Sequence, residues 1–132
     1  MAGETEKVTI NLGPVDLGQI DLLVQEGCYS NRTDFIRTAI RNQLAAQAEL
    51  VRQTVARKTL VLGAQHFSRA DLEALRAAGE TVRISVLGLA TIAEDVPPEL
   101  ARATIASLTV LGALRASAAV RAALVGRITS GT

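Results

Sequence analysis

Residues 7–12, Lys-Val-Thr-Ile-Asn-Leu, alternate polar and apolar side chains, and this stretch decides the fold class of the N-terminal half. In an extended strand the apolar residues share one face, which holds Val8, Ile10 and Leu12. The polar residues share the opposite face, which holds Lys7, Thr9 and Asn11. A single strand at this place has no neighbour in sequence, so its backbone hydrogen bonds are unmet. The same strand from a second copy would satisfy them in a two-stranded antiparallel ribbon across a two-fold axis.

Such a ribbon would present its polar face twice, and a two-stranded ribbon fits the major groove of DNA. Thr9 and Asn11 can contact base edges there, and Lys7 can reach either a guanine or a phosphate. The pattern therefore favours a protein that binds double-stranded DNA in a sequence-specific manner.

Two helical patterns follow the strand. We expect Asp16 to cap a first helix after Gly13-Pro14, because apolar residues then recur at spacings of three and four, and we expect Gly27 to end it. Ser30 is expected to cap a second helix that continues to about residue 57. Its apolar stripe contains Phe35, Ile36, Ala39, Ile40 and Leu44.

The start of the second helix is a candidate phosphate site. A helix N-terminus carries unpaired amides and the positive end of the helix dipole, which favour an anion. Further donors gather at the same place, namely Ser30, Asn31, Arg32 and Thr33. The alternative is an ordinary helix cap with a solvated arginine.

Residues 7–45 resemble the ribbon-helix-helix repressors, the group that includes Arc, MetJ and CopG. The resemblance is carried by the strand at residues 7–12 and by the stretch Gly-Cys-Tyr-Ser-Asn-Arg-Thr-Asp-Phe-Ile-Arg-Thr-Ala-Ile-Arg at residues 27–41. It covers about a third of the chain, and Gly13-Pro14-Val15 departs from the family pattern in a way that can shift the first helix.

The resemblance implies an intertwined dimer that binds DNA with both parts of this segment. The implied base contacts are Lys7, Thr9 and Asn11, and the implied phosphate contacts are Ser30, Asn31, Arg32 and Thr33. The implied dimer core consists of Val8, Ile10, Leu12, Ile20, Phe35, Ile36 and Ile40.

The C-terminal half contains a short repeat. The triplet Val-Leu-Gly recurs at residues 61–63, 86–88 and 110–112, and each copy is expected to end a β-rich run, at 59–62, 82–87 and 108–111. Helical stretches are expected at 69–78 after Ser68, at 99–107 after Pro97-Pro98, and at 117–125. A strand–loop–helix unit of this length predicts a short solenoid with parallel strands. A compact three-stranded α/β domain and chance similarity are the alternatives.

Together these patterns predict an α+β chain of four segments. Residues 1–6 are expected to be flexible, 7–57 to form the DNA-binding domain, 58–128 to form the repeat domain, and 129–132 to be a flexible tail. The apolar segment 113–128 has only arginines as charged residues, and a short stack of repeats leaves open strand edges. We therefore expect the C-terminal half to join dimers into higher oligomers.

The composition narrows the function only slightly. The net charge is +1, with seven basic and seven acidic residues in 1–58 and seven and six in 59–132, so binding to phosphates would need local patches. Aromatic residues make up 2% of the chain, which disfavours stacking on single strands. The single cysteine, Cys28, excludes an internal disulfide, and no signal or membrane-spanning segment is evident, which favours the cytoplasm.

Catalysis is not indicated. His66 has no partners at a ligand spacing, Glu94-Asp95 is interpreted as a solvated acidic pair, and the glycines form no phosphate loop. We expect no enzyme, no metal site and no cofactor. The leading function is a transcriptional repressor that multimerises through its C-terminal half. The alternatives are an antitoxin, whose C-terminal half would mask a toxin partner, and a structural protein that polymerises.

Overall fold

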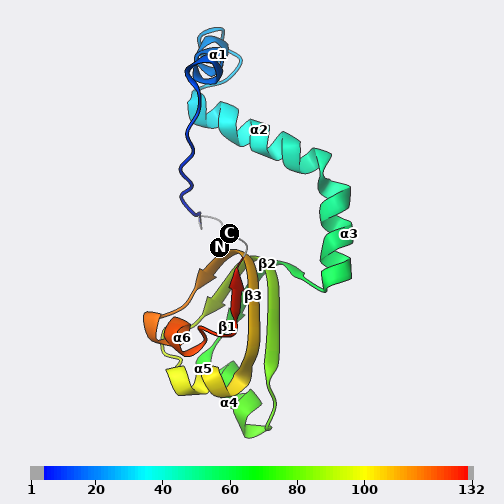
Figure 1. Cartoon of the computed structure of the whole chain (residues 1–132), viewed down its shortest axis with the longest axis vertical. Coiled ribbons are helices and arrows are strands. Elements are labelled where there is room, and N and C mark those ends of the chain that lie inside the picture. The colour runs from blue at the N-terminus through cyan, green and yellow to red at the C-terminus, as the bar shows by residue number, and fades with distance from the viewer. Residues whose placement is uncertain (1–4, 131–132) are drawn as a thin grey trace. The chain divides into compact units, whose positions relative to one another are not determined.

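The computed structural model describes residues 5–130, and the chain divides into two compact units, Met1–Gln53 and Thr54–Thr132 (Figure 1). Each unit is described by itself. Of the segments expected to be flexible, residues 1–4 and 131–132 lie outside the described residues. The N-terminal unit is helical after an extended start, and the C-terminal unit combines helices with a parallel sheet, so the chain mixes both element types as expected.

The N-terminal unit begins with residues 5–13, which belong to no helix or strand in the single chain. Helix α1 runs over Pro14–Gln25, so the expectation that Asp16 caps it was wrong. Gly13 is the N-cap and Pro14 the first helical residue, because a proline lacks the amide that would be unpaired there. Gly27, with φ +81°, ends the helix as expected, and the amide of Cys28 donates to the carbonyl of Leu23 at 3.0 Å.

Helix α2 runs over Arg32–Ala46, and its cap is Asn31 rather than the expected Ser30. The amide side chain of Asn31 accepts a hydrogen bond from the backbone N–H of Asp34 at 2.8 Å, which is the function of an N-cap residue. The helical region extends to residue 58 but not as one helix. Gln47 interrupts it, and helix α3 follows over Ala48–Lys58.

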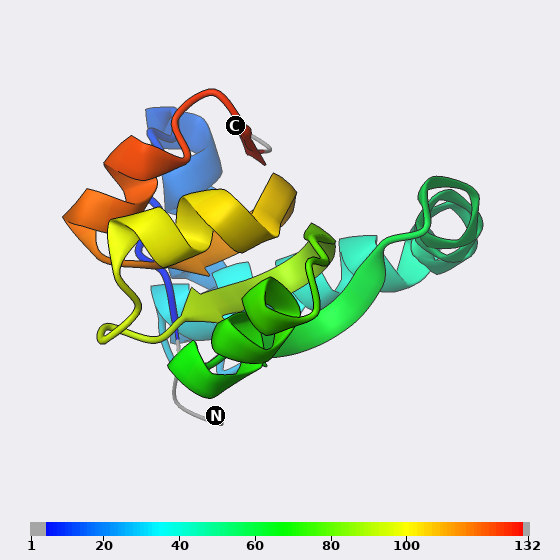
Figure 2. The same cartoon turned by 90° about the horizontal axis from the view of Figure 1, so that it is seen from below.

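The C-terminal unit contains a four-stranded parallel sheet in the order β1-β2-β3-β4. The elements alternate along the chain, and Figure 2 shows α4, α5 and α6 one after another beside the strands. Their bounds are β1 Val61–Phe67, α4 Arg69–Ala77, β2 Val82–Ile92, α5 Pro98–Thr104, β3 Ile105–Arg115, α6 Ala118–Ala123 and β4 Ile128–Ser130.

The three Val-Leu-Gly triplets lie side by side in the sheet. Gly63 pairs with Gly88, and Gly88 pairs with Gly112. All three have positive φ, and a Cβ on Gly88 would lie 2.1 Å from the carbonyl oxygen of Gly63. The same distance separates a Cβ on Gly112 from the carbonyl oxygen of Gly88. Glycine is therefore required twice over in these two strands, for its conformation and for the close approach of the backbones.

The strands continue beyond these glycines, so the expectation that each triplet ends a strand was wrong. β1 begins at Val61 rather than Thr59, because Thr59 has φ +54° and terminates α3. β2 and β3 end at Ile92 and Arg115, well past their glycines. The glycines keep the chain extended in a conformation that other residues rarely adopt, and the ladder of strand pairing continues through them.

The helices of this unit begin close to the expected caps but are shorter. Ser68 accepts from the N–H of Asp71 at 3.1 Å and its own N–H donates to the Asp71 carboxylate at 3.0 Å, which is a complete capping box. Ser117 caps α6 through one hydrogen bond, which its side chain accepts from the N–H of Val120 at 3.2 Å. Helix α5 ends at Thr104 instead of 107, because β3 takes over at Ile105.

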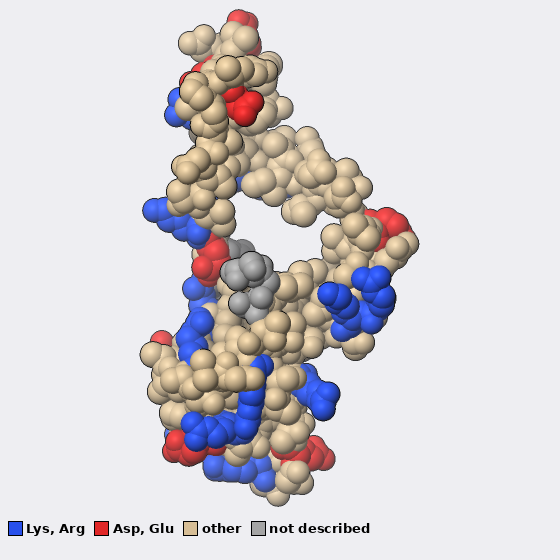
Figure 3. Space-filling model, viewed as in Figure 1, with Lys and Arg blue, Asp and Glu red and all other residues tan. Residues whose placement is uncertain are grey.

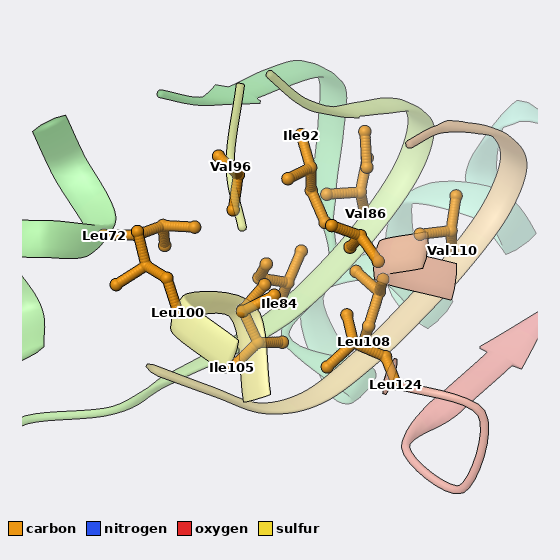
Figure 4. Packing of buried hydrophobic residues seen from close by; sticks show 13 residues of the cluster. Leu72, Ile84, Val86, Ile92, Val96, Leu100, Ile105, Leu108, Val110 and Leu124 are labelled. Atoms are coloured by element: carbon orange, nitrogen blue, oxygen red, sulfur yellow. The ribbon is translucent and has the colours of Figure 1, made fainter. Parts of the chain in front are cut away.

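One face of the sheet is packed against the helices (Figure 4). Ile84, Val86, Ala90 and Ile92 of β2 are buried on this face, where they meet the buried side chains of the helices. The core comprises Leu72, Ile84, Val86, Ala90, Ile92, Val96, Leu100, Ala101, Ile105, Leu108, Val110, Val120 and Leu124. The one buried polar side chain among the described residues is Thr104, whose hydroxyl donates to the carbonyl of Leu100 at 2.7 Å. The C-terminal unit thus completes a core from its own residues.

Candidate nucleic-acid interface

The extended segment that precedes α1 exposes all of its side chains in the single chain. Residues 5–13 are all exposed, including the three polar residues expected to face bases, Lys7, Thr9 and Asn11. The apolar residues between them are exposed as well, and Val8 retains 79% of its accessible surface. An apolar row left in water is unfavourable by roughly 25 cal/mol per Å². The segment therefore has the polar surface that a ligand needs and an apolar surface that stays largely exposed among the described residues.

An apolar hollow lies between the end of this segment and the two helices. It has a volume of roughly 350 Å³ and is lined by Leu12, Asp16, Gln19, Ile20, Leu23 and Phe35. Of the seven residues expected in the dimer core, Ile20 is buried and Phe35 and Ile36 are half-buried. The other four, Val8, Ile10, Leu12 and Ile40, are exposed in the single chain. The core of this unit is open on one side.

The structure brings the four expected phosphate contacts together at the start of α2, since they are consecutive residues of one turn. Asn31 is committed to the cap, and the backbone N–H of Ser30 donates to the Asp34 carboxylate at 2.9 Å. The hydroxyl groups of Ser30 and Thr33 and the guanidinium of Arg32 remain at the surface. Asp34 already places one negative charge at the positive end of the helix dipole. A phosphate at this position would be bound by hydroxyl and guanidinium donors next to an acidic cap.

Arg32 is paired with Asp21 of α1 in a two-point contact. Its Nε donates to Asp21 Oδ1 at 2.7 Å and its Nη2 to Oδ2 at 2.8 Å. These hydrogen bonds lower the pKa of Asp21 below its ordinary value and raise that of Arg32. The pair joins α1 to α2 and fixes the planar guanidinium at the start of α2. It also neutralises part of the positive charge that a phosphate would meet.

Sequence reasoning missed both acidic residues at this site. Asp34 was detectable, because a carboxylate three residues after an Asn or Ser is a common signal for a capped helix start. Asp21 was not detectable, since it lies eleven residues before Arg32 and on a different helix. Only the packing of α1 on α2 brings the two side chains together.

The positive charge on one face of the molecule can be followed in a space-filling view. On the face shown in Figure 3, Lys and Arg side chains form several separate patches with neutral surface between them. In residues 5–130, no group of three or more His, Cys, Asp or Glu side chains could hold a metal ion. Over the same range no helix has the length and apolar character that crossing a bilayer requires.

Comparison with known proteins identifies the class to which this chain belongs. The model of the ribbon-helix-helix transcriptional regulator family matches residues 3–121, and the chain belongs to that family. Regulators of this family bind DNA, typically as dimers, and are typically non-enzymatic. The match extends from the N-terminal unit through β1, β2 and β3 into α6, so it covers far more than residues 7–45. Searches of curated proteins and of solved structures found no significant match.

Proposed function

We propose that this chain is a cytoplasmic transcriptional repressor, which dimerises through residues 7–12 and inserts the shared ribbon into the major groove. The observation that carries the proposal is the exposed alternating segment, which has polar side chains on one face and apolar ones on the other. Pairing two such segments would satisfy the backbone groups that face each other, and it would place the two apolar faces side by side against the helices of the dimer. A repressor of this kind would occupy its operator and exclude other proteins from it.

In this proposal the side chains on the polar face of the ribbon contact the bases. Asn11 can make a two-point contact with adenine, Thr9 can bond to a base or contact a thymine methyl group, and Lys7 can donate to guanine. A two-fold ribbon presents each of these side chains twice, so the expected operator is palindromic or repeated. Phosphate contacts at the start of α2, by Ser30, Asn31, Arg32 and Thr33, would fix the ribbon in the groove without adding sequence preference.

The C-terminal unit serves higher assembly in this proposal. Two observations support a short solenoid-like repeat. Three glycines are in register in neighbouring strands, and a helix follows each of the first three strands. Linking several dimers on adjacent half-sites would raise the affinity for an operator through effective concentration. The folded core of this unit also disfavours the antitoxin alternative, since antitoxin tails that mask a toxin are often disordered until they bind.

Selection of bound fragments from a random DNA library, followed by titration of the selected site at fixed salt, tests this function. We expect Thr9→Ala and Asn11→Ala to weaken cognate binding by about 1–3 kcal/mol and to relax sequence preference. Matched controls are Thr38→Ala and Asn42→Ala, which remove the same groups from α2 and should bind as the wild type does. A chain that selects no sequence, or variants of the ribbon that bind as well as their controls, would refute the proposal and favour a structural protein.

A further inference from the structure

Strand β1 forms one edge of the sheet and lacks the features with which proteins usually protect an edge (Figure 2). Its seven residues, Val-Leu-Gly-Ala-Gln-His-Phe, include no Lys, Arg, Asp, Glu or Pro. Its pairing with β2 is regular over the whole strand, without a bulge. The opposite edge is different, because β4 has only three residues. A long, regular, uncharged edge is a template for another strand.

The backbone of β1 has hydrogen-bond partners on one side only. In residues 5–130, β1 is paired with β2, and the carbonyl of Phe67 also accepts from the N–H of Ala93 at 3.0 Å. No backbone hydrogen bond of the described chain reaches the opposite side of the strand. Since alternate residues of a strand direct their N–H and C=O groups outward, part of the β1 backbone is left to water.

Gly63, Gly88 and Gly112 lie next to one another across the three strands, and we call them the glycine ladder. Their geometry indicates that the free side of β1 is accessible to another backbone. On Gly88 and Gly112, the missing Cβ points toward the carbonyl oxygen of the preceding strand's glycine. Gly63 has a similar φ, +124°, and would direct its Cβ away from β2, where nothing lies within 4 Å. The edge therefore has an open recess at Gly63 in place of a side chain.

Apolar exposure in the C-terminal unit is concentrated on the same strand. The large apolar residues that this unit leaves exposed among its described residues are Val61, Leu62 and Val125. Two of these three are in β1, and Leu62 retains 69% of its accessible surface. Pairing of β1 with another uncharged strand would bring no like charges together and would reduce this exposure.

We propose that β1 pairs with β1 of a second copy in antiparallel orientation, so that two sheets join into one across a two-fold axis. A seven-residue strand that pairs with itself over its full length places Val61 opposite Phe67 and Ala64 opposite Ala64. The isologous contact closes on itself, so it forms a defined pair rather than an open fibre.

The N-terminal unit supplies the second copy at high local concentration, and to this extent the inference rests on the proposed dimer. Only Thr59 and Leu60 separate α3 from β1. Chains held together at the N-terminus therefore have their β1 edges tethered, and pairing inside such a dimer or between neighbouring dimers is favoured by effective concentration.

Disulfide trapping in the full chain tests this pairing. Because Cys28 is exposed, the background is Cys28→Ser, and Ala64→Cys is added to it. Directly opposed residues of antiparallel strands have Cα atoms about 4.5–5.5 Å apart, which is within the range for a disulfide. We expect mild oxidation at about 10 μM protein to convert most of the Ala64→Cys chains to covalent dimers, as seen on a non-reducing gel.

Leu89→Cys in the same background is the matched control, because Leu89 pairs with Ala64 in the same row of the sheet. In the proposed assembly two Leu89 positions are three strand spacings apart, roughly 14 Å, which is beyond the reach of a disulfide. An Ala64→Cys chain that stays monomeric would overturn the proposal. Equal cross-linking of Leu89→Cys would overturn it too, because it would indicate face-to-face packing. Trapping does not depend on DNA, so a chain that cross-links but selects no operator would refute the proposed function alone.

Discussion

The two units of this chain differ in whether they can bury their own apolar residues. Between Thr54 and Ser130, thirteen apolar residues form a buried cluster. Between residues 5 and 53, Ile20 is the only buried apolar residue. The same stretch exposes Val8, Ile10, Leu12, Val15, Leu22, Ile40, Leu44 and Leu50. The C-terminal unit therefore buries its apolar side chains within a single chain. The N-terminal unit leaves most of its apolar side chains exposed, as expected for a unit that completes its core with a second copy.

The largest predicted effect is a loss of stability in the C-terminal unit when a glycine of the glycine ladder is replaced. Gly88→Ala would place a Cβ 2.1 Å from the Gly63 carbonyl oxygen, in a residue with φ +139°. We expect a loss of about 3 kcal/mol or more in the free energy of unfolding of the C-terminal unit, from overpacking and backbone strain together. Denaturant unfolding followed by circular dichroism measures it.

Gly126→Ala is the control for this substitution, since nothing lies within 4 Å of its missing Cβ and its φ is not positive. Its effect should stay within about 0.5 kcal/mol. Equal stability of the two variants would mean that the three glycines do not approach one another as described.

Two valines with the same exposed fraction test whether the N-terminal unit buries its apolar side chains in a dimer. Val8 and Val125 each retain 79% of their accessible surface in the single chain. If the N-terminal unit is half of a shared core, Val8→Ser should weaken dimerisation by about 1.5–3 kcal/mol per buried side chain. Val125→Ser should change neither dimerisation nor stability by more than about 0.5 kcal/mol. Sedimentation equilibrium over a dilution series distinguishes the two, and equal effects would remove the basis for a shared core.

The ion pair at the start of α2 gives a smaller, salt-dependent effect. Arg32→Gln should weaken binding to all DNA sequences by about tenfold and reduce the salt slope by about one unit. Asp21→Asn should do the opposite and strengthen binding a few-fold, because it releases the guanidinium from its partner. Glu26→Gln, an exposed carboxylate at the end of α1, controls for net charge alone. If Asp21→Asn and Glu26→Gln bind alike, the pair does not regulate the phosphate site.

A stabilising substitution is expected at the junction of α3 and β1. Thr59 is β-branched and has φ +54°, a conformation that costs non-glycine residues about 1–2 kcal/mol. Thr59→Gly should therefore raise the free energy of unfolding by about 1 kcal/mol, measured by thermal unfolding. Thr129→Gly, in the exposed part of β4, should not stabilise the chain. A destabilised Thr59→Gly variant would contradict the conformation described for this residue.

The smallest effect concerns pH. Hydrogen bonds from the backbone N–H and the side chain of Ser68 lower the pKa of Asp71 below its ordinary value of 3.8. The charged carboxylate thus stabilises the folded unit above pH 3.8, and this contribution is lost as the pH falls through the lowered pKa. Asp71→Asn should flatten the decline of stability in this acid range. A decline of unchanged steepness would show that the capping carboxylate contributes nothing to it.

Local signals in the sequence predicted the C-terminal helices more accurately than the strands. Ser68 caps α4 as expected, and α5 begins at the expected pair of prolines, because these signals depend on a few neighbouring residues. The strand ends predicted at Gly63, Gly88 and Gly112 are wrong, because a glycine in a local sequence resembles a break in a strand. Whether a glycine ends a strand or continues it depends on the neighbouring strand, which the local sequence does not contain.

The candidate site shows the same limit. The four candidate phosphate contacts at the start of α2 could be predicted because they are contiguous in the sequence. Which of Ser30 and Asn31 is the cap depends on the backbone conformation of Asn31, which the sequence does not determine. The pair of Arg32 with Asp21 could not be predicted, since it joins two helices. The ribbon remains a prediction, because it needs atoms from a second chain.

The most direct test of the central claim is an isotope-filtered nuclear Overhauser experiment on a dimer of one labelled and one unlabelled chain. Antiparallel pairing that keeps the polar side chains on one face places the two-fold axis at a residue, Thr9 or Ile10, and not between two residues. It predicts contacts between chains among these residues and their neighbours. It also predicts slow exchange of the alternate amides in this stretch that face the partner strand in the dimer. Contacts that occur only within one chain, together with rapid exchange of residues 7–12 in the dimer, would contradict the account.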